Sequence, residues 1–157
     1  MNPKKYPVAL VAVKPSKSVK GEVGLFALRD INEGTVIMAY TDLGRESLMS
    51  YDDFDKLDDI TKERMKHFCV QYPDGIWVPD NINNMTLHWH MNHKCDPNVC
   101  VDENDNRVAA RDIKAGEELF LDFSTIFKNP EYSLKCNCGS PQCRGIVNGK
   151  DDIPEGA

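Results

Sequence analysis

The sequence predicts a mainly β fold of the α+β class, with one helix inserted among short strands. Short apolar runs bounded by Gly, Pro or Asn recur along the chain, and this pattern is typical of strands. One stretch, residues 50–68, has apolar residues at helical spacing instead. At 157 residues the chain fits one compact domain.

The strands are expected in six apolar runs, which in chain order are Val8–Val13, Val23–Leu28, Val36–Tyr40, Ile76–Pro79, Val108–Arg111 and Glu118–Phe123. Two segments place a glycine where a positive φ is tolerated and are expected to form matching hairpin turns. These segments are Ile31–Gly34 and Ile113–Glu117.

The inserted helix is predicted between the third and fourth strands. Ser50 followed three residues later by Asp53 resembles a capping box, which marks a helix start. Phe54, Met65 and Phe68 then recur near helical spacing, so one face of this helix is expected to be buried.

The composition favours some classes of partner over others. A formal net charge of −6 with 28% charged residues argues against a nucleic-acid-binding surface, and a basic protein partner is easier to accommodate. No run approaches the roughly 18 apolar residues of a membrane span, and no secretory signal is recognisable. We therefore expect a soluble, intracellular chain in a reducing compartment, without direct nucleic-acid or membrane binding.

Three cysteines, Cys136, Cys138 and Cys143, lie within eight residues and supply most of a metal site. A structural zinc ion takes four thiolate or imidazole ligands, so one more ligand is needed. Spacing alone leaves several candidates open: Cys69, Cys95, Cys100, His67, His88, His90 and His93. Context favours Cys95, which precedes an Asp-Pro-Asn turn, whereas Cys69 and Cys100 sit beside valines and are expected in the core.

A second metal site at His88 and His90 is a weaker hypothesis. On a strand, His-x-His would place both rings on one face. Because no carboxylate lies at a diagnostic spacing, two ordinary surface or core histidines are the better interpretation.

Four segments together resemble the SET-domain protein-lysine methyltransferases that carry a post-SET zinc motif. The resemblance covers about residues 7–147, and the last three segments in combination are highly specific. The segments are Val23–Ala27, Asn92–Asn98, Gly116–Phe123 and Cys136–Gly145.

This resemblance implies a SET fold of several short β-sheets with a pseudoknot, one inserted helix and a C-terminal post-SET zinc knot. The implied SET domain spans residues 1–128, with a helical insert at about 47–68. The post-SET zinc-binding segment would span residues 129–149, and residues 150–157 would form a flexible tail.

The family also implies S-adenosylmethionine as cofactor and one structural zinc. The cofactor-binding residues carried over from the family motifs are Gly24, Leu25, Phe26, Asn92, His93 and Leu134. The zinc ligands carried over are Cys95, Cys136, Cys138 and Cys143.

The catalytic positions implied by the resemblance are Tyr40, Leu121 and Phe123. Related enzymes carry a tyrosine where this chain has Phe123, and the lost hydroxyl would contribute on the order of 10²-fold to rate. Tyr40 resembles another channel tyrosine and is a candidate for the remaining hydroxyl. Leu121, smaller than the family's Phe or Tyr, leaves room for a more methylated lysine.

The resemblance therefore predicts a protein-lysine N-methyltransferase that acts on a histone tail or another lysine-containing protein. A nuclear or chromatin-associated location would follow in a eukaryote or on host chromatin. The alternative is a catalytically weak or inactive SET module that binds a protein partner, because Phe123 replaces the tyrosine.

Overall fold

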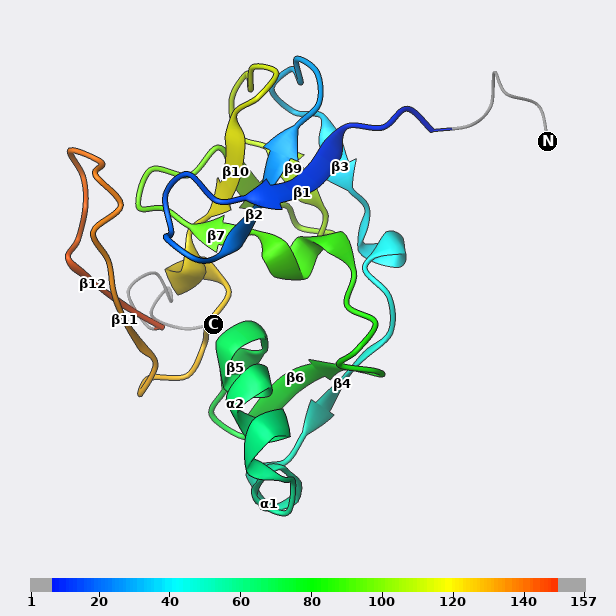
Figure 1. The fold of residues 1–157 in the computed structure, drawn as a ribbon, viewed down its shortest axis with the longest axis vertical. Coiled ribbons are helices and arrows are strands. Elements are labelled where there is room, and N and C mark those ends of the chain that lie inside the picture. Colours follow the sequence, from blue (N-terminus) through cyan, green and yellow to red (C-terminus); the bar gives the residue numbers. More distant parts are fainter. Residues whose placement is uncertain (1–6, 150–157) are drawn as a thin grey trace.

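The computed structural model describes residues 7–149 of the chain (Figure 1). The tail expected at residues 150–157 lies outside the described residues. As predicted, the described chain consists mostly of small β-sheets with short helical segments between them.

The central sheet has the strand order β1-β2-β10-β7. Its strands are β1 (Val11–Pro15), β2 (Val23–Ala27), β7 (Asn92–His93) and β10 (Glu118–Leu121). β10 pairs antiparallel with β2 and parallel with β7, with Phe120 opposite Asn92 and Leu121 opposite His93. The sheet therefore holds two distant sequence motifs, the Asn92–His93 block and the Glu118–Leu121 strand, side by side.

A second sheet has the order β3-β9-β8 and consists of β3 (Val36–Met38), β8 (Val99–Val101) and β9 (Arg107–Ala109). The expectation that the two glycine turns are hairpins is wrong, because each turn leads from one sheet to the other. The turns instead lie against each other, since Ile31 and Ile113 exchange two backbone hydrogen bonds of 2.8 Å. Gly34 and Gly116 do have positive φ, 78° and 84°.

The insert combines a three-stranded sheet with helices and extends away from the central sheet (Figure 1). Its sheet order is β4-β6-β5, from β4 (Glu46–Met49), β5 (Val70–Tyr72) and β6 (Gly75–Pro79). The helical segment consists of two helices rather than one, α1 (Tyr51–Asp55) and α2 (Asp59–Phe68). The Ser50 hydroxyl accepts the Asp53 amide as predicted, but the Asp58 side chain caps a second start by accepting the Thr61 amide.

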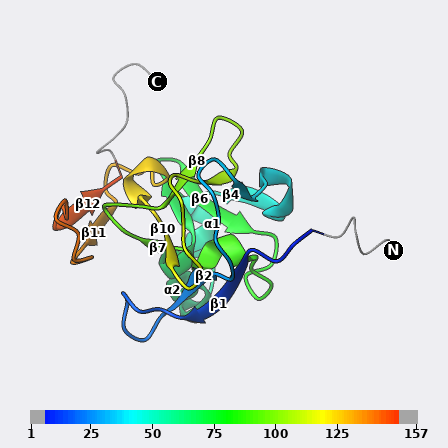
Figure 2. The same cartoon turned by 90° about the horizontal axis from the view of Figure 1, so that it is seen from above.

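Short 3-10 helices end two of the expected strands early. η2 (Tyr40–Asp42) follows β3, and η4 (Phe123–Thr125) follows β10, where the Asp122 side chain accepts the Ser124 amide. A third, η3 (Leu87–His90), leads into β7. A hairpin of β11 (Ser133–Lys135) and β12 (Ile146–Asn148) then forms one side of the molecule (Figures 1 and 2).

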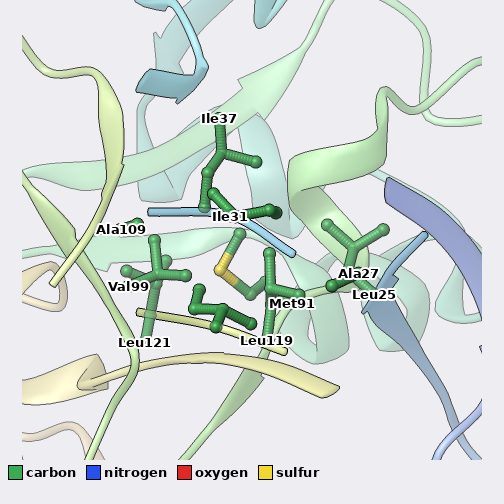
Figure 3. Close-up of a cluster of buried hydrophobic side chains, with 10 residues drawn as sticks. Leu25, Ala27, Ile31, Ile37, Met91, Val99, Ala109, Leu119 and Leu121 are labelled. Carbon is green, nitrogen blue, oxygen red and sulfur yellow. The ribbon is translucent and has the colours of Figure 1, made fainter. Parts of the chain in front are cut away.

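Two apolar cores hold these parts together. The larger lies between the central and second sheets, and side chains from β2, β8, β9 and β10 converge there around Met91 (Figure 3). The smaller fills the insert, where Phe54 and Met65 of the two helices pack with Ile76, Val78 and Trp89. No helix within residues 7–149 is long and apolar enough to cross a membrane.

Candidate functional site

The four cysteines predicted as zinc ligands come together in the structure. The Sγ atoms of Cys95, Cys136, Cys138 and Cys143 all lie within 4.8 Å of one another. The Cys95–Cys136 and Cys136–Cys143 Sγ distances are 3.8 and 3.9 Å. A tetrahedral zinc with bonds of about 2.3 Å has sulfur–sulfur edges of about 3.8 Å, so this donor set fits zinc.

The other two cysteines lie outside this cluster. Cys69 is fully buried in the insert core, as expected. The expectation that Cys100 is a core residue is wrong, because Cys100 is exposed. Side chains alternate along a strand, and β8 turns its neighbour Val99 inward and Cys100 outward.

The pKa values of two of the clustered thiols move in opposite directions. Burial raises the pKa of Cys136 to about 12. Burial also acts to raise the pKa of Cys138, but hydrogen bonds from neighbouring groups outweigh it and lower that pKa to about 7. Four adjacent thiolates repel one another, so full ionisation of the cluster requires a cation such as zinc.

Arg144 connects the loop that carries Cys136, Cys138 and Cys143 to the segment after β10. Its guanidinium donates to the Ser124 hydroxyl at 3.0 Å and pairs with the Asp122 carboxylate, while its backbone amide lies 3.5 Å from the Cys95 sulfur. Burial alone would raise the pKa of Asp122, but the hydrogen bonds from Arg144 and Ser124 lower it overall. This contact was not predicted, although Arg144 stands within the cysteine motif.

A cavity of about 850 Å³ opens beside the cysteine cluster. Its walls come from the β1–β2 loop, the end of α2, η3 with β7, the η4 region, and residues Glu131–Cys138. Protein pockets for small molecules and cofactors have volumes of roughly 300–1,000 Å³, so the cavity has room for such a ligand.

The predicted site residues divide into those that line this cavity and those that do not. The lining residues are Asn92, His93, Leu121, Phe123 and Leu134, together with Cys136 and Cys138 of the cysteine cluster. Among the others, Leu25 and Phe26 are 0% and 2% exposed in the protein interior, and Tyr40 is 57% exposed on the surface.

Gly24 also lies off the cavity and faces the Glu118 carboxylate. A Cβ at Gly24 would overlap that carboxylate and lie 3.2 Å from Asn92 Nδ2. The buried carboxylate accepts hydrogen bonds from the Ser16 hydroxyl at 2.6 Å, the Lys17 amide at 3.0 Å and Asn92 at 3.2 Å. The glycine is therefore required to admit Glu118, whose role the sequence did not reveal although it lies in a recognised motif.

Asn98 is another buried polar residue that sequence reasoning missed. It is 2% exposed, donates to the Glu118 carbonyl at 2.9 Å and accepts the Phe120 amide at 2.8 Å. Both bonds go to the backbone of β10, so Asn98 fixes the strand that carries Leu121 toward the cavity.

Asn92 and His93 are held by the strands beside them. Asn92 donates to the Val23 carbonyl at 2.9 Å, and His93 Nδ1 accepts the Phe123 amide at 3.0 Å. Burial lowers the pKa of His93. The neutral ring therefore carries its proton on Nε2, which lies 3.3 Å from the Cys95 sulfur.

Four rings follow one another along the cavity, from His93 through Phe123 and Phe127 to Tyr132. The successive centroid distances are 5.4, 5.2 and 4.1 Å, and the last pair is stacked. Burial raises the pKa of Tyr132. No motif in the sequence pointed to Phe127 or Tyr132.

The histidines of the weaker metal hypothesis lie in η3 rather than on a strand. His88 Nε2 is 2.9 Å from Glu46, and its Nδ1 is 2.7 Å from the Thr86 hydroxyl. The His90 ring lies edge-on to Phe68. Within the described part of the chain, only the four-cysteine group meets the geometry of a metal cluster of three or more ligands.

Comparison with known proteins gives a consistent result. The family model of the SET domain matches residues 22–124. Histone-lysine N-methyltransferase ASHH2 of Arabidopsis thaliana is 28% identical over 85% of this chain, and trr of Drosophila melanogaster is 31% identical over 80%. Among solved structures, a humanized mutant of the Chaetomium thermophilum Polycomb Repressive Complex 2 bound to the inhibitor GSK126 has a TM-score of 0.53 and 28% identity over 78% of this chain.

The relatives are much longer proteins. The chain covers 8% of the ASHH2 sequence, 5% of trr and 16% of the matched chain in the solved structure.

Proposed function

The chain belongs to the SET-domain family, and from this premise we propose that it is an S-adenosylmethionine-dependent protein-lysine N-methyltransferase. The observation that carries the proposal is the cavity where the Asn92–His93 strand, the segment after β10 and the cysteine-bearing hairpin meet. Asn92, His93, Leu121, Phe123, Cys136 and Cys138 in this cavity come from segments that resemble the family.

The cavity is suited to the cofactor in size and chemistry. Its wall combines polar groups at Asn92 and His93 with apolar groups at Leu121 and Leu134, and these four residues would hold S-adenosylmethionine. When bound, the cofactor would supply a methyl group activated by its positively charged sulfur, for transfer to a neutral lysine nitrogen that gives up a proton to water.

The chain's own residues have to deliver a neutral amine and exclude water. A free lysine has a pKa near 10.4, but an apolar wall disfavours its ammonium form. Leu121, Phe123 and Phe127 supply such a wall. The remaining contribution is alignment of the amine with the methyl group. Alignment alone can account for a large share of the reduction in the activation barrier.

The cysteine cluster supports the same cavity. Cys136 and Cys138 belong both to the cluster and to the cavity wall, so zinc binding would order that wall. The zinc in this proposal is structural, because all four of its positions are filled by protein ligands.

We take a lysine-containing protein, with histones as the first class to test, as the substrate. The matched relatives are named histone-lysine N-methyltransferases, and the net charge of −6 suits a basic partner. A nuclear or chromatin-associated site of action would follow from such a substrate.

The test is methyl transfer to a core-histone mixture, with the modified lysines mapped by mass spectrometry. Asn92→Ala should reduce transfer, because Asn92 lines the cavity, whereas Asn104→Ala, on an exposed turn, should not. Failure of the wild-type chain to methylate any histone or lysine peptide, with S-adenosylmethionine bound in calorimetry, would overturn the proposal.

One observation favours a second candidate, a catalytically silent SET module that binds a protein partner. Phe123 presents an apolar ring to the cavity between His93 and Phe127, where the family has a tyrosine hydroxyl. A Phe123→Tyr variant separates the candidates. An inert wild type whose variant transfers methyl groups supports the silent module, while an active wild type excludes it.

A further inference from the structure

Tyr132 lies in the segment that joins η4 to the C-terminal hairpin, outside every motif that carries the family resemblance. It lines the same cavity as Phe123 and Phe127. We propose that the Tyr132 hydroxyl contacts the lysine nitrogen in this cavity and takes the place of the hydroxyl that Phe123 lacks. This inference rests on the proposed methyltransferase function.

The other tyrosines of the described chain do not line this cavity. Tyr40 is exposed away from the cavity, and Tyr51 donates its hydroxyl to the Tyr72 carbonyl at 2.7 Å. Tyr72 sets its ring against Trp77 in the insert. Among residues 7–149, Tyr132 is thus the tyrosine that lines the cavity.

The position of the Tyr132 ring is fixed by its neighbours. The ring stacks on Phe127 with a centroid distance of 4.1 Å and an interplanar angle of 15°. Its backbone amide donates to the Asn129 carbonyl, and its carbonyl accepts the Gly149 amide. Because the backbone of Tyr132 is hydrogen-bonded and one face of its ring is stacked, the hydroxyl points in a defined direction, as a catalytic contact requires.

The protonation state of the Tyr132 hydroxyl suits contact with a lysine amine. Burial raises the pKa of Tyr132, so the phenol stays protonated at neutral pH and keeps both its donor and its acceptor capacity. Its oxygen can accept an N–H bond from the neutral lysine amine and so orient the nitrogen lone pair. Within residues 7–149 this hydroxyl makes no hydrogen bond to another residue, which leaves it available to a ligand.

The experiment compares Tyr132→Phe with Tyr72→Phe, which makes the same chemical change outside the cavity. On a histone peptide that the wild-type chain methylates, we expect Tyr132→Phe to lower kcat about 10²-fold. The affinity for S-adenosylhomocysteine should stay at the wild-type value in calorimetry. Tyr72→Phe should leave both kcat and this affinity unchanged, and Phe123→Tyr added to Tyr132→Phe should restore part of the lost rate.

A binding measurement tests the contact without turnover. With S-adenosylhomocysteine present, Tyr132→Phe should weaken binding of the unmethylated peptide about fivefold, because one hydrogen bond is lost. Binding of the same peptide with a trimethylated lysine, which has no N–H group to donate, should not change.

Failure of the Tyr132 assignment can be distinguished from failure of the proposed methyltransferase function. If Tyr132→Phe keeps the wild-type kcat and peptide affinity, or if Tyr40→Phe causes the loss instead, the assignment to Tyr132 is wrong and the methyltransferase function stands. If the wild-type chain binds the cofactor and methylates nothing, the proposed function fails and the role of Tyr132 fails with it.

Discussion

The guanidinium of Arg144 pairs with the carboxylate of Asp122, so the loop that carries three of the four clustered cysteines is tied to the turn that follows β10. Asp122 precedes Phe123, and Arg144 follows Cys143. The cysteine cluster and the aromatic part of the cavity are therefore joined by one hydrogen-bonded contact.

Loss of this pair should destabilise the C-terminal hairpin. The side chains of Arg144 and Asp122 are only 28% and 16% exposed, so Asp122→Asn should lower the free energy of unfolding by about 1–3 kcal/mol. Urea denaturation of the variant and the wild type measures the difference. The exposed pair of Asp30 and Lys114 offers the control, because Asp30→Asn should have little effect.

The same pair predicts a pH dependence. The pKa of Asp122 is lower in the folded chain than in the unfolded one, so its stabilising effect is complete above the unfolded value of about 3.9 and is lost as the pH falls toward the folded value. The stability difference between wild type and Asp122→Asn should therefore be constant near neutral pH and shrink below about pH 4. A difference that grows on acidification would contradict this mechanism.

Metal analysis should find one zinc per chain. Chelation should increase hydrogen exchange across β11 and β12, since metal binding provides much of the folding energy of a segment with little core of its own. Cys95→Ser should lose the metal, while Cys100→Ser, which changes an exposed cysteine outside the cluster, should retain it. Full metal content in Cys95→Ser would exclude the four-cysteine site.

Gly24→Ala should lower the free energy of unfolding because of the neighbouring Glu118 side chain. The added methyl group overlaps the buried Glu118 carboxylate, and overpacking of this kind costs about 1–3 kcal/mol. Glu118→Ala removes the obstacle, so the double variant should lose less stability than the sum of the two single variants. Additive losses in thermal or urea unfolding would show that the contact with Glu118 does not set the cost.

Asn98→Ala should weaken the central sheet at its junction with the second sheet. The substitution leaves the Glu118 carbonyl and the Phe120 amide without their buried partner. We therefore expect the free energy of unfolding to fall by about 1–3 kcal/mol. Asn104→Ala, on the exposed turn after β8, is the matched control and should leave the urea midpoint unchanged.

The sequence motifs predicted the fold class and the cysteine cluster because their residues act through fixed spacing and local chemistry. The Asp-Pro-Asn context favours Cys95 among several candidates, and the structure brings Cys95 to the other three cysteines. The division of the helical segment was missed because Leu57 continues the helical spacing, while the Asp58 cap restarts the helix.

Other site residues could not be predicted because their positions depend on long-range packing. Tyr40 ends an apolar run, but β3 stops at Met38 and η2 carries the side chain to the surface. Tyr132 and Phe127 belong to no motif, and they reach the cavity only because the chain after η4 folds back beside Phe123. Ring stacking between residues five apart in an irregular segment has no periodic signal.

Because Cys136 and Cys138 belong both to the cavity wall and to the cysteine cluster, a metal held by the cluster and a ligand held in the cavity would affect each other's binding. Thermodynamic reciprocity requires that if metal raises the affinity of the cavity for a ligand by some factor, the ligand raises the affinity of the cysteines for metal by the same factor. A filled cavity would then raise the share of chains that hold the metal, so that fewer cysteine thiols would be open to oxidation while a ligand is bound.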